Sequence, residues 1–255
     1  TELTGNMQAH LSDYNINIKD FLRVDKIEKD AANPKAAKKL HLSSGEVIES
    51  KAVIVATGAK WRELGIPGEK ENVGSGVAYC PHCDGPFFKG KDVAVVGGGN
   101  SGIEAALDLA GMVNHVTVFE FLPELKADKI LVDKAEANDK ITIIKNVATK
   151  EVLATDGSVV GLAYEDRITG EIKRQNLSGI FVQIGLVPNS DFLNGVVERT
   201  QHGEIIIDEK CHTTEPGIFA AGDVSTVPYK QIVIAMGEGA KASLSAFDYI
   251  IREYY

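Results

Sequence analysis

Two cysteines placed three residues apart are the side chains in this 255-residue chain best suited to chemistry. Cys80 and Cys83 form a Cys-x-x-Cys pattern, typical of a dithiol/disulfide redox pair, of half a zinc site, or of two unrelated core cysteines. A structural zinc site needs more ligands at a second knuckle, and the third cysteine, Cys211, stands alone. We therefore favour redox chemistry, in which one thiolate attacks a disulfide and the other resolves the mixed disulfide. We predict no metal site and leave Cys211 to packing.

His82 lies between the two cysteines. Its charge would tune the neighbouring thiolates if the imidazole were close to them. A simple surface histidine is the alternative. The sequence does not separate these two interpretations.

A glycine-rich stretch, residues 97–102, follows the cysteine pair in a complete structural context. The apolar run at residues 93–96 precedes it, a helix-like segment at residues 103–109 follows it, and a second apolar run ends at residue 120. This order predicts a βαβ unit that binds a dinucleotide. A glycine-rich turn without a ligand is the alternative.

Each residue of this motif has an expected task. Gly97 permits the tight turn, Gly99 lets a pyrophosphate approach the backbone, and Gly102 lets the helix pack closely on the strand. Asn100 and Ser101 begin the helix, so the phosphates would lie at its positive end.

Glu120 stands at the end of the second strand of this unit. A carboxylate there accepts hydrogen bonds from a ribose 2′-hydroxyl and repels a 2′-phosphate. We therefore expect NADH rather than NADPH.

The composition is that of an ordinary globular protein of one or two domains, with 44% hydrophobic and 25% charged residues. The formal net charge of −9 has no basic block to offset it, which argues against binding to nucleic acid or to anionic membranes. No apolar run of about 18 residues and no signal-peptide pattern is present. With three cysteines and no disulfide framework, we expect a cytoplasmic protein.

The first sixty residues alternate polar and apolar side chains as half-buried strands do. We expect a helix over residues 4–14, followed by strands over residues 15–19, 21–24 and 39–42. Residues 52–58 are apolar on both faces, as a central strand would be. They end in Thr57 and Gly58, where the backbone can approach a ligand closely.

The middle of the chain predicts a second group of elements between two linkers rich in glycine or proline, residues 60–76 and 187–189. The expected elements are a helix over residues 123–137, a strand over residues 141–144, a hairpin turning at residues 156–158 and a buried strand over residues 180–185.

The last third predicts two strands and a helix. The strands cover residues 203–208 and 218–223, and a helix rich in small residues covers residues 231–251. Gly222 and Asp223 end the second strand, where an acid is placed to bind a sugar-like hydroxyl chain, although it can also merely cap a turn.

Together these motifs carry a family resemblance that covers nearly the whole chain. Their order is Ala56-Thr57-Gly58, Cys80-Pro81-His82-Cys83-Asp84-Gly85, Gly97-Gly98-Gly99-Asn100-Ser101-Gly102, Ile184-Gly185 and Gly222-Asp223. In this order the chain resembles the low-molecular-weight thioredoxin reductase family. More narrowly, the cysteine box, Glu120, Phe181-Val182-Gln183-Ile184-Gly185 and the segments at residues 229–231 and 247–249 resemble the flavoprotein subunits of alkyl hydroperoxide reductases.

The resemblance implies an α/β fold with two Rossmann-like, three-layer nucleotide-binding domains. Residues 1–66 and 188–255 would form a discontinuous FAD-binding domain, and residues 67–187 an NAD-binding domain that carries the cysteine pair. The family opens with its own strand and glycine motif for FAD, which this sequence lacks. We therefore expect a truncated FAD domain, and we expect the thioredoxin-like domains of the reductase subunits to be missing.

The resemblance also assigns roles to residues. Cys83 would face the flavin, Cys80 would exchange with the acceptor disulfide, and Asp84 would manage the proton. Gly222 and Asp223 would contact the ribityl and phosphate part of FAD, and the helix start near Gln231 would face the flavin ring. The expected cofactor-binding residues are Thr57, Gly58, Gly97, Gly99, Asn100, Ser101, Gly102, Glu120, Gly185, Gly222, Asp223, Lys230, Gln231 and Ala235.

The implied function is that of an FAD-dependent NADH:disulfide oxidoreductase. Electrons would pass from NADH through FAD to the Cys80/Cys83 pair, then through a thioredoxin-like domain to a peroxiredoxin for peroxide reduction, in a homodimer. Two alternatives stay open: a thioredoxin reductase, against which Glu120 speaks, and a flavin-free NAD-binding fragment without turnover.

Overall fold

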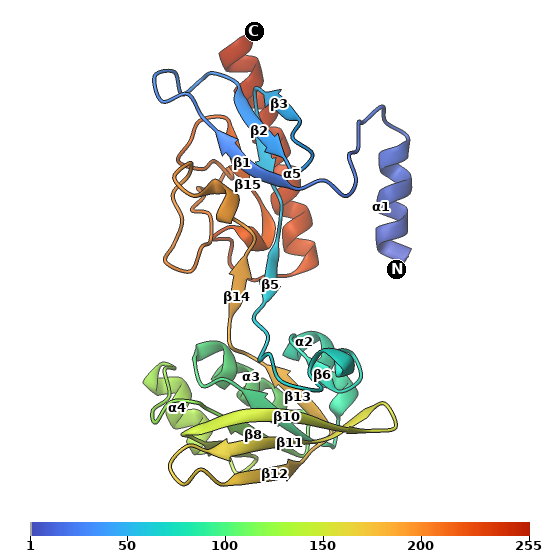
Figure 1. The fold of residues 1–255 in the computed structure, drawn as a ribbon, viewed down its shortest axis with the longest axis vertical. Coiled ribbons are helices and arrows are strands. Elements are labelled where there is room, and N and C mark those ends of the chain that lie inside the picture. Colours follow the sequence, from blue (N-terminus) through green and yellow to red (C-terminus); the bar gives the residue numbers. More distant parts are fainter. Residues whose placement is uncertain (1) are drawn as a thin grey trace. The chain divides into compact units, whose positions relative to one another are not determined.

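The computed structural model describes residues 2–255, which divide into two compact units. The inserted unit comprises residues 60–187, and the flanking unit combines the chain up to residue 59 with residues 188–255. In Figure 1 the chain enters the inserted unit along β5 (Ala59–Trp61) and leaves it along β14 (Leu186–Pro188), and these two strands pair. The sequence places the first domain boundary after residue 66, whereas the structure divides the chain after residue 59. None of the described helices combines the length and the apolar character that a membrane span requires.

A five-stranded parallel sheet forms the centre of the inserted unit, in the order β6-β13-β7-β8-β9. The strands are β6 (Val77–Ala78), β13 (Gly179–Val182), β7 (Asp92–Val96), β8 (His115–Phe119) and β9 (Ile141–Ile144). The apolar run in β7 is a strand because both of its faces are covered. Val93 and Val95 pack into one hydrophobic cluster, while Ala94 and Val96 pack into another on the opposite face.

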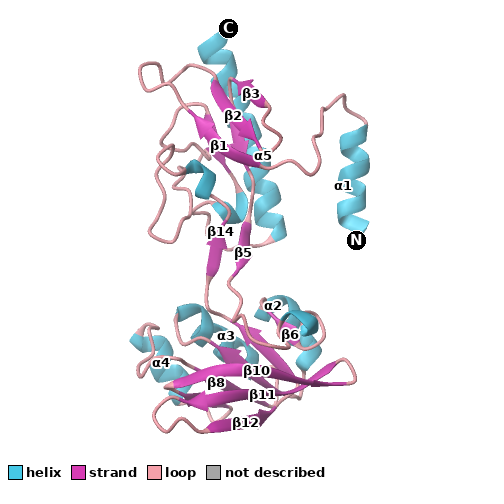
Figure 2. Ribbon diagram, in the orientation of Figure 1, coloured by secondary structure: helices cyan, strands magenta, loops and turns pink. Residues whose placement is uncertain are grey.

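Two different layers cover these faces. Helices α3 (Asn100–Ala110) and α4 (Lys129–Glu136) pack on the Val93 side. A three-stranded antiparallel sheet packs on the Ala94 side. Its strands are β10 (Val147–Thr155), β11 (Ser158–Asp166) and β12 (Ile172–Asn176), and Figure 2 shows them together with the helices. The expected three-layer α/β architecture is confirmed for this unit.

The flanking unit has smaller sheets and the longest helix. Its elements are α1 (Glu2–Ser12), the antiparallel strands β1 (Val24–Glu28), β2 (Lys38–Leu42) and β3 (Val47–Ser50), the parallel pair β4 (Val53–Val55) and β15 (Ile218–Ala220), and α5 (Ile232–Tyr254). Helix α5 packs on β15 because Ala242 and Ala246, one turn apart, let it approach Phe219 closely.

Several sequence predictions hold in the structure, with shifts at their ends. The strand at residues 141–144, the hairpin turning at residues 156–158 and the long C-terminal helix are confirmed. The helix expected over residues 123–137 begins only at Lys129. The segment before it is held as a loop, because Lys126 N–H donates to the Gly98 carbonyl (2.9 Å) and Asp128 N–H donates to Asn100 Oδ1 (2.7 Å).

Two predicted strands near the N-terminus are wrong. Residues 15–19 form no strand among the described residues, and the next strand, β1, begins at Val24 rather than at residue 21. Phe21 is fully exposed, with a φ of 59° that no strand residue adopts. Polar and apolar alternation makes a strand only where a neighbouring strand supplies hydrogen-bond partners. For the same reason residues 203–208 form only isolated bridges, through Ile205.

The prediction of a central strand at residues 52–58 is also corrected. Within residues 2–255, β4 pairs with β15 alone, and Ile54 is 40% exposed. An apolar run on both faces indicates that a strand tends to be covered, but it does not specify which strands lie beside it.

A buried ion pair holds β2 in the flanking unit. Lys38 is fully buried, and its Nζ donates to Glu215 Oε1 (2.7 Å) and to the Pro34 carbonyl (2.6 Å). Lys29 Nζ donates to the other carboxylate oxygen at 3.1 Å. Removing one partner of such a pair leaves a buried charge without compensation.

We expect K38M to lower the free energy of unfolding by about 3 kcal/mol, because Glu215 then keeps only Lys29 as a partner. Urea unfolding followed by circular dichroism measures this change. K39M is the matched control, since it removes an exposed pair with Glu49 and should change stability by less than about 0.5 kcal/mol. Equal losses in both variants would contradict the role given to burial.

Candidate active site

The candidate active site lies along one edge of the parallel sheet in the inserted unit. Parallel strands end on the same side, so the residues that follow them share one edge. Cys80 comes after β6, Gln183 after β13, Gly97 after β7 and Glu120 after β8. The structure thus brings the cysteine pair and the dinucleotide motif to one edge.

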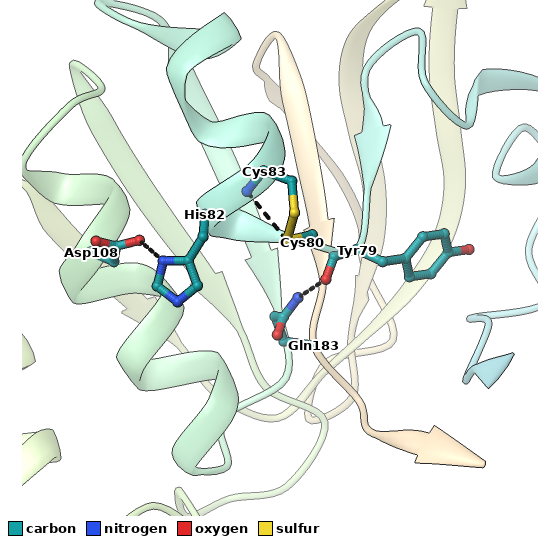
Figure 3. The surroundings of a disulfide bond; sticks show 6 residues. All are labelled: Tyr79, Cys80, His82, Cys83, Asp108 and Gln183. Carbon is teal, nitrogen blue, oxygen red and sulfur yellow. Dashed lines mark hydrogen bonds and ion pairs between the residues drawn. A yellow bond between two sulfur atoms is a disulfide. The ribbon is translucent and has the colours of Figure 1, made fainter. Parts of the chain in front are cut away.

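Cys80 and Cys83 form a disulfide bond across the short helix α2 (Pro81–Asp84), shown in Figure 3. Cys80 caps this helix, because its Sγ accepts the Cys83 N–H (3.2 Å) and its carbonyl accepts the Asp84 N–H (3.0 Å). Cys80 is half-buried and Cys83 is exposed. The pair is therefore in its oxidised state, at the start of a helix that exposes Cys83.

His82 contacts α3 in this structure. Figure 3 shows its ring turned toward Asp108, and His82 Nδ1 lies 2.9 Å from Asp108 Oδ2. The glycine that follows α2 assists this packing. A Cβ on Gly85 would lie 3.0 Å from side-chain atoms of Leu109 and Met112, so only glycine lets the turn approach α3 without displacing them. The cysteine turn is thus held against the helix that starts at the glycine motif.

The glycine motif shows why two of its glycines are required. A Cβ on Gly102 would lie 1.9 Å from the Gly97 carbonyl oxygen. Gly97 has a φ of 120°, and its Cβ would lie 2.4 Å from the Gln183 carbonyl oxygen. A Cβ on Gly99, in contrast, would meet no atom within 4 Å. That space is where the motif would admit a phosphate group.

The two residues after this loop differ in their contacts. Asn100 is engaged with the loop before α4, since its Nδ2 donates to Asp128 Oδ2 (3.1 Å) and its Oδ1 accepts the Asp128 N–H. Ser101 is exposed on the first turn of α3. Within residues 2–255, Ser101 therefore does not share the side-chain hydrogen bonds that hold Asn100 to the loop before α4.

Glu120 is buried, with 8% of its surface exposed, and supports the glycine loop. Its Oε2 accepts the Gly98 N–H (2.5 Å) and its Oε1 accepts the Leu122 N–H (2.8 Å). Each carboxylate oxygen has two lone pairs, so acceptor capacity remains for a ribose hydroxyl. The sequence placed this acid at the strand end but did not show its contact with the loop.

The flanking unit holds a second group of the expected cofactor residues. Thr57 and Gly58 follow β4, while Gly222 and Asp223 follow β15, so all four lie at one end of a parallel pair. Thr57 Oγ1 donates to the Asn189 carbonyl (2.7 Å). Gly58 and Gly222 have φ values of 65° and 70°, which favour glycine.

The start of α5 lies beside Gly222. A Cβ there would be 3.3 Å from the Ala235 Cβ, so the helix passes close to the strand end. Gln231 occupies the N-cap position and is exposed. Lys230 Nζ donates to the Ser225 carbonyl (2.6 Å) and pairs with Glu204 (3.1 Å). Gly185, the last expected cofactor residue, belongs to the inserted unit.

Sequence reasoning missed the residues that fix Tyr79, directly before Cys80. The Tyr79 hydroxyl donates to buried Glu69 (3.0 Å), and its ring stacks on Trp61 with 6.0 Å between centroids. Burial, and then the Glu69 carboxylate, raise the pKa of Tyr79 above its ordinary value. Gln183 Nε2 donates to the Tyr79 carbonyl (2.8 Å). The one signal in the sequence for these contacts was Gln183 itself, a polar residue at the end of a buried strand.

Cys211 lies apart from this site, in the flanking unit. It is fully buried, and its Sγ donates to Glu238 Oε2 (3.1 Å). Burial, with the nearby Glu238 carboxylate, raises the pKa of the thiol to about 12. The thiol therefore stays protonated at neutral pH, which agrees with a packing role.

A disulfide and a dinucleotide-type glycine loop on one sheet edge define the class of protein: a nucleotide-dependent disulfide oxidoreductase. The family model described as pyridine nucleotide-disulphide oxidoreductase matches residues 2–239. The chain belongs to this family of flavin-dependent enzymes, which bind FAD and NAD(P)H.

Individual relatives agree with this placement. The chain is 55% identical to a subunit of the alkyl hydroperoxide reductase of Escherichia coli (strain K12) and 53% identical to an NADH dehydrogenase of Bacillus subtilis (strain 168), each over 251 residues. Both matches cover 98% of this chain and 48% of the relative, so the chain spans about half the length of these relatives.

Solved structures show the same relationship. The thioredoxin reductase from Streptococcus pyogenes MGAS5005 has a TM-score of 0.89 and 36% identity, covering 98% of this chain and 80% of that one. The thioredoxin reductase from Giardia duodenalis has a TM-score of 0.90 and 28% identity, covering 98% and 81%. The expected resemblance to thioredoxin reductases and to alkyl hydroperoxide reductase flavoproteins is confirmed.

We expect G102A to weaken NADH binding at least tenfold, because the new Cβ would collide with the Gly97 carbonyl and force the loop open. Isothermal titration calorimetry measures the dissociation constant. G111A, at the end of the same helix, is the control, since its Cβ would lie 3.4 Å from the nearest atom. Equal NADH affinities in the two variants would show that this loop does not hold the dinucleotide.

In the dithiothreitol-reduced protein, we expect iodoacetamide at pH 8 to label Cys80 and Cys83 but not Cys211. With a pKa of about 12, roughly one Cys211 thiol in ten thousand is ionised at that pH. Its labelling rate should rise about tenfold per pH unit while the protein stays folded. Peptide mass spectrometry identifies the labelled sites, and rapid labelling of Cys211 at pH 8 would contradict its burial.

Proposed function

We propose that the protein carrying this chain passes electrons from NADH through FAD to the Cys80–Cys83 disulfide, and from there to an acceptor disulfide. The observation that supports this most directly is the shared sheet edge, where the disulfide follows β6, the glycine loop follows β7, and only β13 lies between these strands. Reduction of the disulfide breaks its S–S bond and consumes two electrons and two protons to give two thiols.

The residues present fit NADH and one part of FAD, since this sequence lacks the family's own glycine motif for FAD. For NADH, the open space at Gly99 admits a phosphate, and Glu120 at the strand end favours a ribose with a free 2′-hydroxyl. For FAD, the strand ends at Thr57, Gly58 and Gly222 offer close backbone approach, and Asp223 offers an acceptor for sugar hydroxyls. When bound, FAD would take up a hydride from NADH and deliver two electrons to the disulfide.

The cysteines then carry out the exchange with the acceptor. The Cys80 thiolate attacks one sulfur of the acceptor disulfide, forms a mixed disulfide and releases the other sulfur as a thiolate. The Cys83 thiolate next displaces that mixed disulfide, so that the Cys80–Cys83 bond forms again and the acceptor leaves with two thiols. Asp84, adjacent to Cys83 on α2, is the proposed holder of the proton that moves during these steps.

The relatives support our proposal for the acceptor. The similarity to the alkyl hydroperoxide reductase of Escherichia coli supports a thioredoxin-like domain as the acceptor, and a peroxiredoxin as the protein that finally reduces peroxide. We also infer a cytoplasmic homodimer. A thioredoxin reductase activity is the second candidate, supported by the similarity to solved thioredoxin reductases.

The visible absorption spectrum, recorded before and after anaerobic addition of NADH, tests this proposal. We expect a flavin spectrum that NADH bleaches, with NADPH less effective at the same concentration because of Glu120. C80S and C83S should keep the bleaching and lose at least 100-fold in the rate of disulfide reduction.

C211S serves as the control and should reduce disulfides at the unchanged rate, since Cys211 lies buried in the other unit. A colourless protein that binds NADH would limit the function to dinucleotide binding. Disulfide reduction that persists in C80S and C83S would overturn the assignment of the redox pair.

A further inference from the structure

We propose that Gln183 is a positioning residue: it fixes the peptide that precedes Cys80 and thereby sets how easily the Cys80–Cys83 disulfide is reduced. This inference rests on the proposed function in one respect, namely that the disulfide is redox-active. It adds a residue from a distant part of the chain to the machinery that controls the pair.

The position of Gln183 follows from the sheet. It comes directly after β13, which lies between β6 and β7, so it stands between the cysteine turn and the glycine loop. Its side-chain amide donates to the Tyr79 carbonyl (2.8 Å) and to the Val182 carbonyl (3.0 Å), as Figure 3 shows for the first bond. The residue is only 8% exposed, so water competes poorly for these bonds.

The backbone of the same residue contacts the dinucleotide motif. A Cβ on Gly97 would lie only 2.4 Å from the Gln183 carbonyl oxygen, so the two backbones are in close contact. Gln183 therefore contacts the glycine loop through its main chain and the cysteine turn through its side chain. A shift of Gln183 would therefore displace both the glycine loop and the cysteine turn.

Tyr79 is fixed from two other directions. Its hydroxyl is bound by Glu69 and its ring stacks on Trp61, so the side chain is anchored independently of Gln183. What Gln183 holds is the carbonyl, which sets the plane of the peptide joining Tyr79 to Cys80. These other anchors mean that loss of the amide should leave the surrounding fold in place.

The effect on redox chemistry differs between the two states of the pair. In the disulfide, the covalent bond itself keeps Cys80 near Cys83. In the dithiol, only non-covalent contacts keep the Cys80 sulfur where it accepts the Cys83 N–H, and a thiolate gains most from that bond. Losing the Gln183 bond should therefore destabilise the reduced pair more than the oxidised pair.

The test is the equilibrium of the protein with defined ratios of reduced to oxidised dithiothreitol, followed by alkylation and mass spectrometry. We expect Q183M and Q183L to shift the equilibrium about tenfold toward the disulfide, which corresponds to about 30 mV. Both variants are close to glutamine in size, and both remove the donor without adding a charge. Q175M, on β12, is the control and should match the unchanged protein.

A second measurement separates positioning from general structural damage. The alkylation rate of Cys80 in the reduced protein should follow a pH profile displaced to higher pH in the Gln183 variants, because its thiolate loses a well-placed hydrogen bond. The other titratable groups near the pair are His82 and Asp84 on α2, Asp108, which contacts His82, and Tyr79 with its partner Glu69. All of them remain in the variants. Circular dichroism verifies that each variant is folded.

The outcomes distinguish this inference from the proposed function. Neither measurement requires bound flavin or NADH. If the unchanged protein had no disulfide that dithiothreitol could reduce, the proposed function would fail. If its disulfide were reducible, and folded Q183M or Q183L gave the same equilibrium and the same pH profile within twofold, the role of Gln183 would be overturned.

Discussion

The register of β13 between β6 and β7 is the constraint on which the rest of the site depends. Ile180 lies opposite Val77 on one side and Ala94 on the other, and the parallel bonds continue to the ends of these strands. This pairing inserts a strand from late in the chain between two that come early. A slip of one residue would turn the side chains of β13 to the wrong faces and move Gln183 away from the cysteine turn.

Close packing then decides how rigidly the cysteine turn is held. Phe88 follows the turn and enters the core, where its ring meets Phe181 at 5.3 Å between centroids. Gly179 makes this possible, since a Cβ there would lie 2.4 Å from the Phe88 ring. The turn is thus anchored behind Cys83 by a buried aromatic residue and before Cys80 by the contacts of Tyr79. Between these anchors, the exposed residue Cys83 lies on a turn that is packed on both sides.

Sequence reasoning reached the parts of the structure that local chemistry determines. The spacing of Gly97, Gly99 and Gly102 predicted the loop, and its tightest steric demand is local, since a Cβ on Gly102 would collide with the Gly97 carbonyl. It failed at residues 15–24, where apolar alternation met no neighbouring strand. It also missed the pairing of Tyr79 with Gln183, because two residues about a hundred positions apart meet only once the sheet has formed.

The topology of the insertion has a consequence for how the chain folds. The inserted unit is one continuous segment, so its contacts join residues within a single stretch of chain. The flanking unit, by contrast, must close a loop of about 160 residues before β4 can pair with β15, an entropy loss of roughly 4.5 kcal/mol for a flexible chain. Pairing of β5 with β14 joins two segments inside that loop and shortens the part that remains open. Folding of the inserted unit therefore shortens the loop that the two separate segments of the flanking unit have to close.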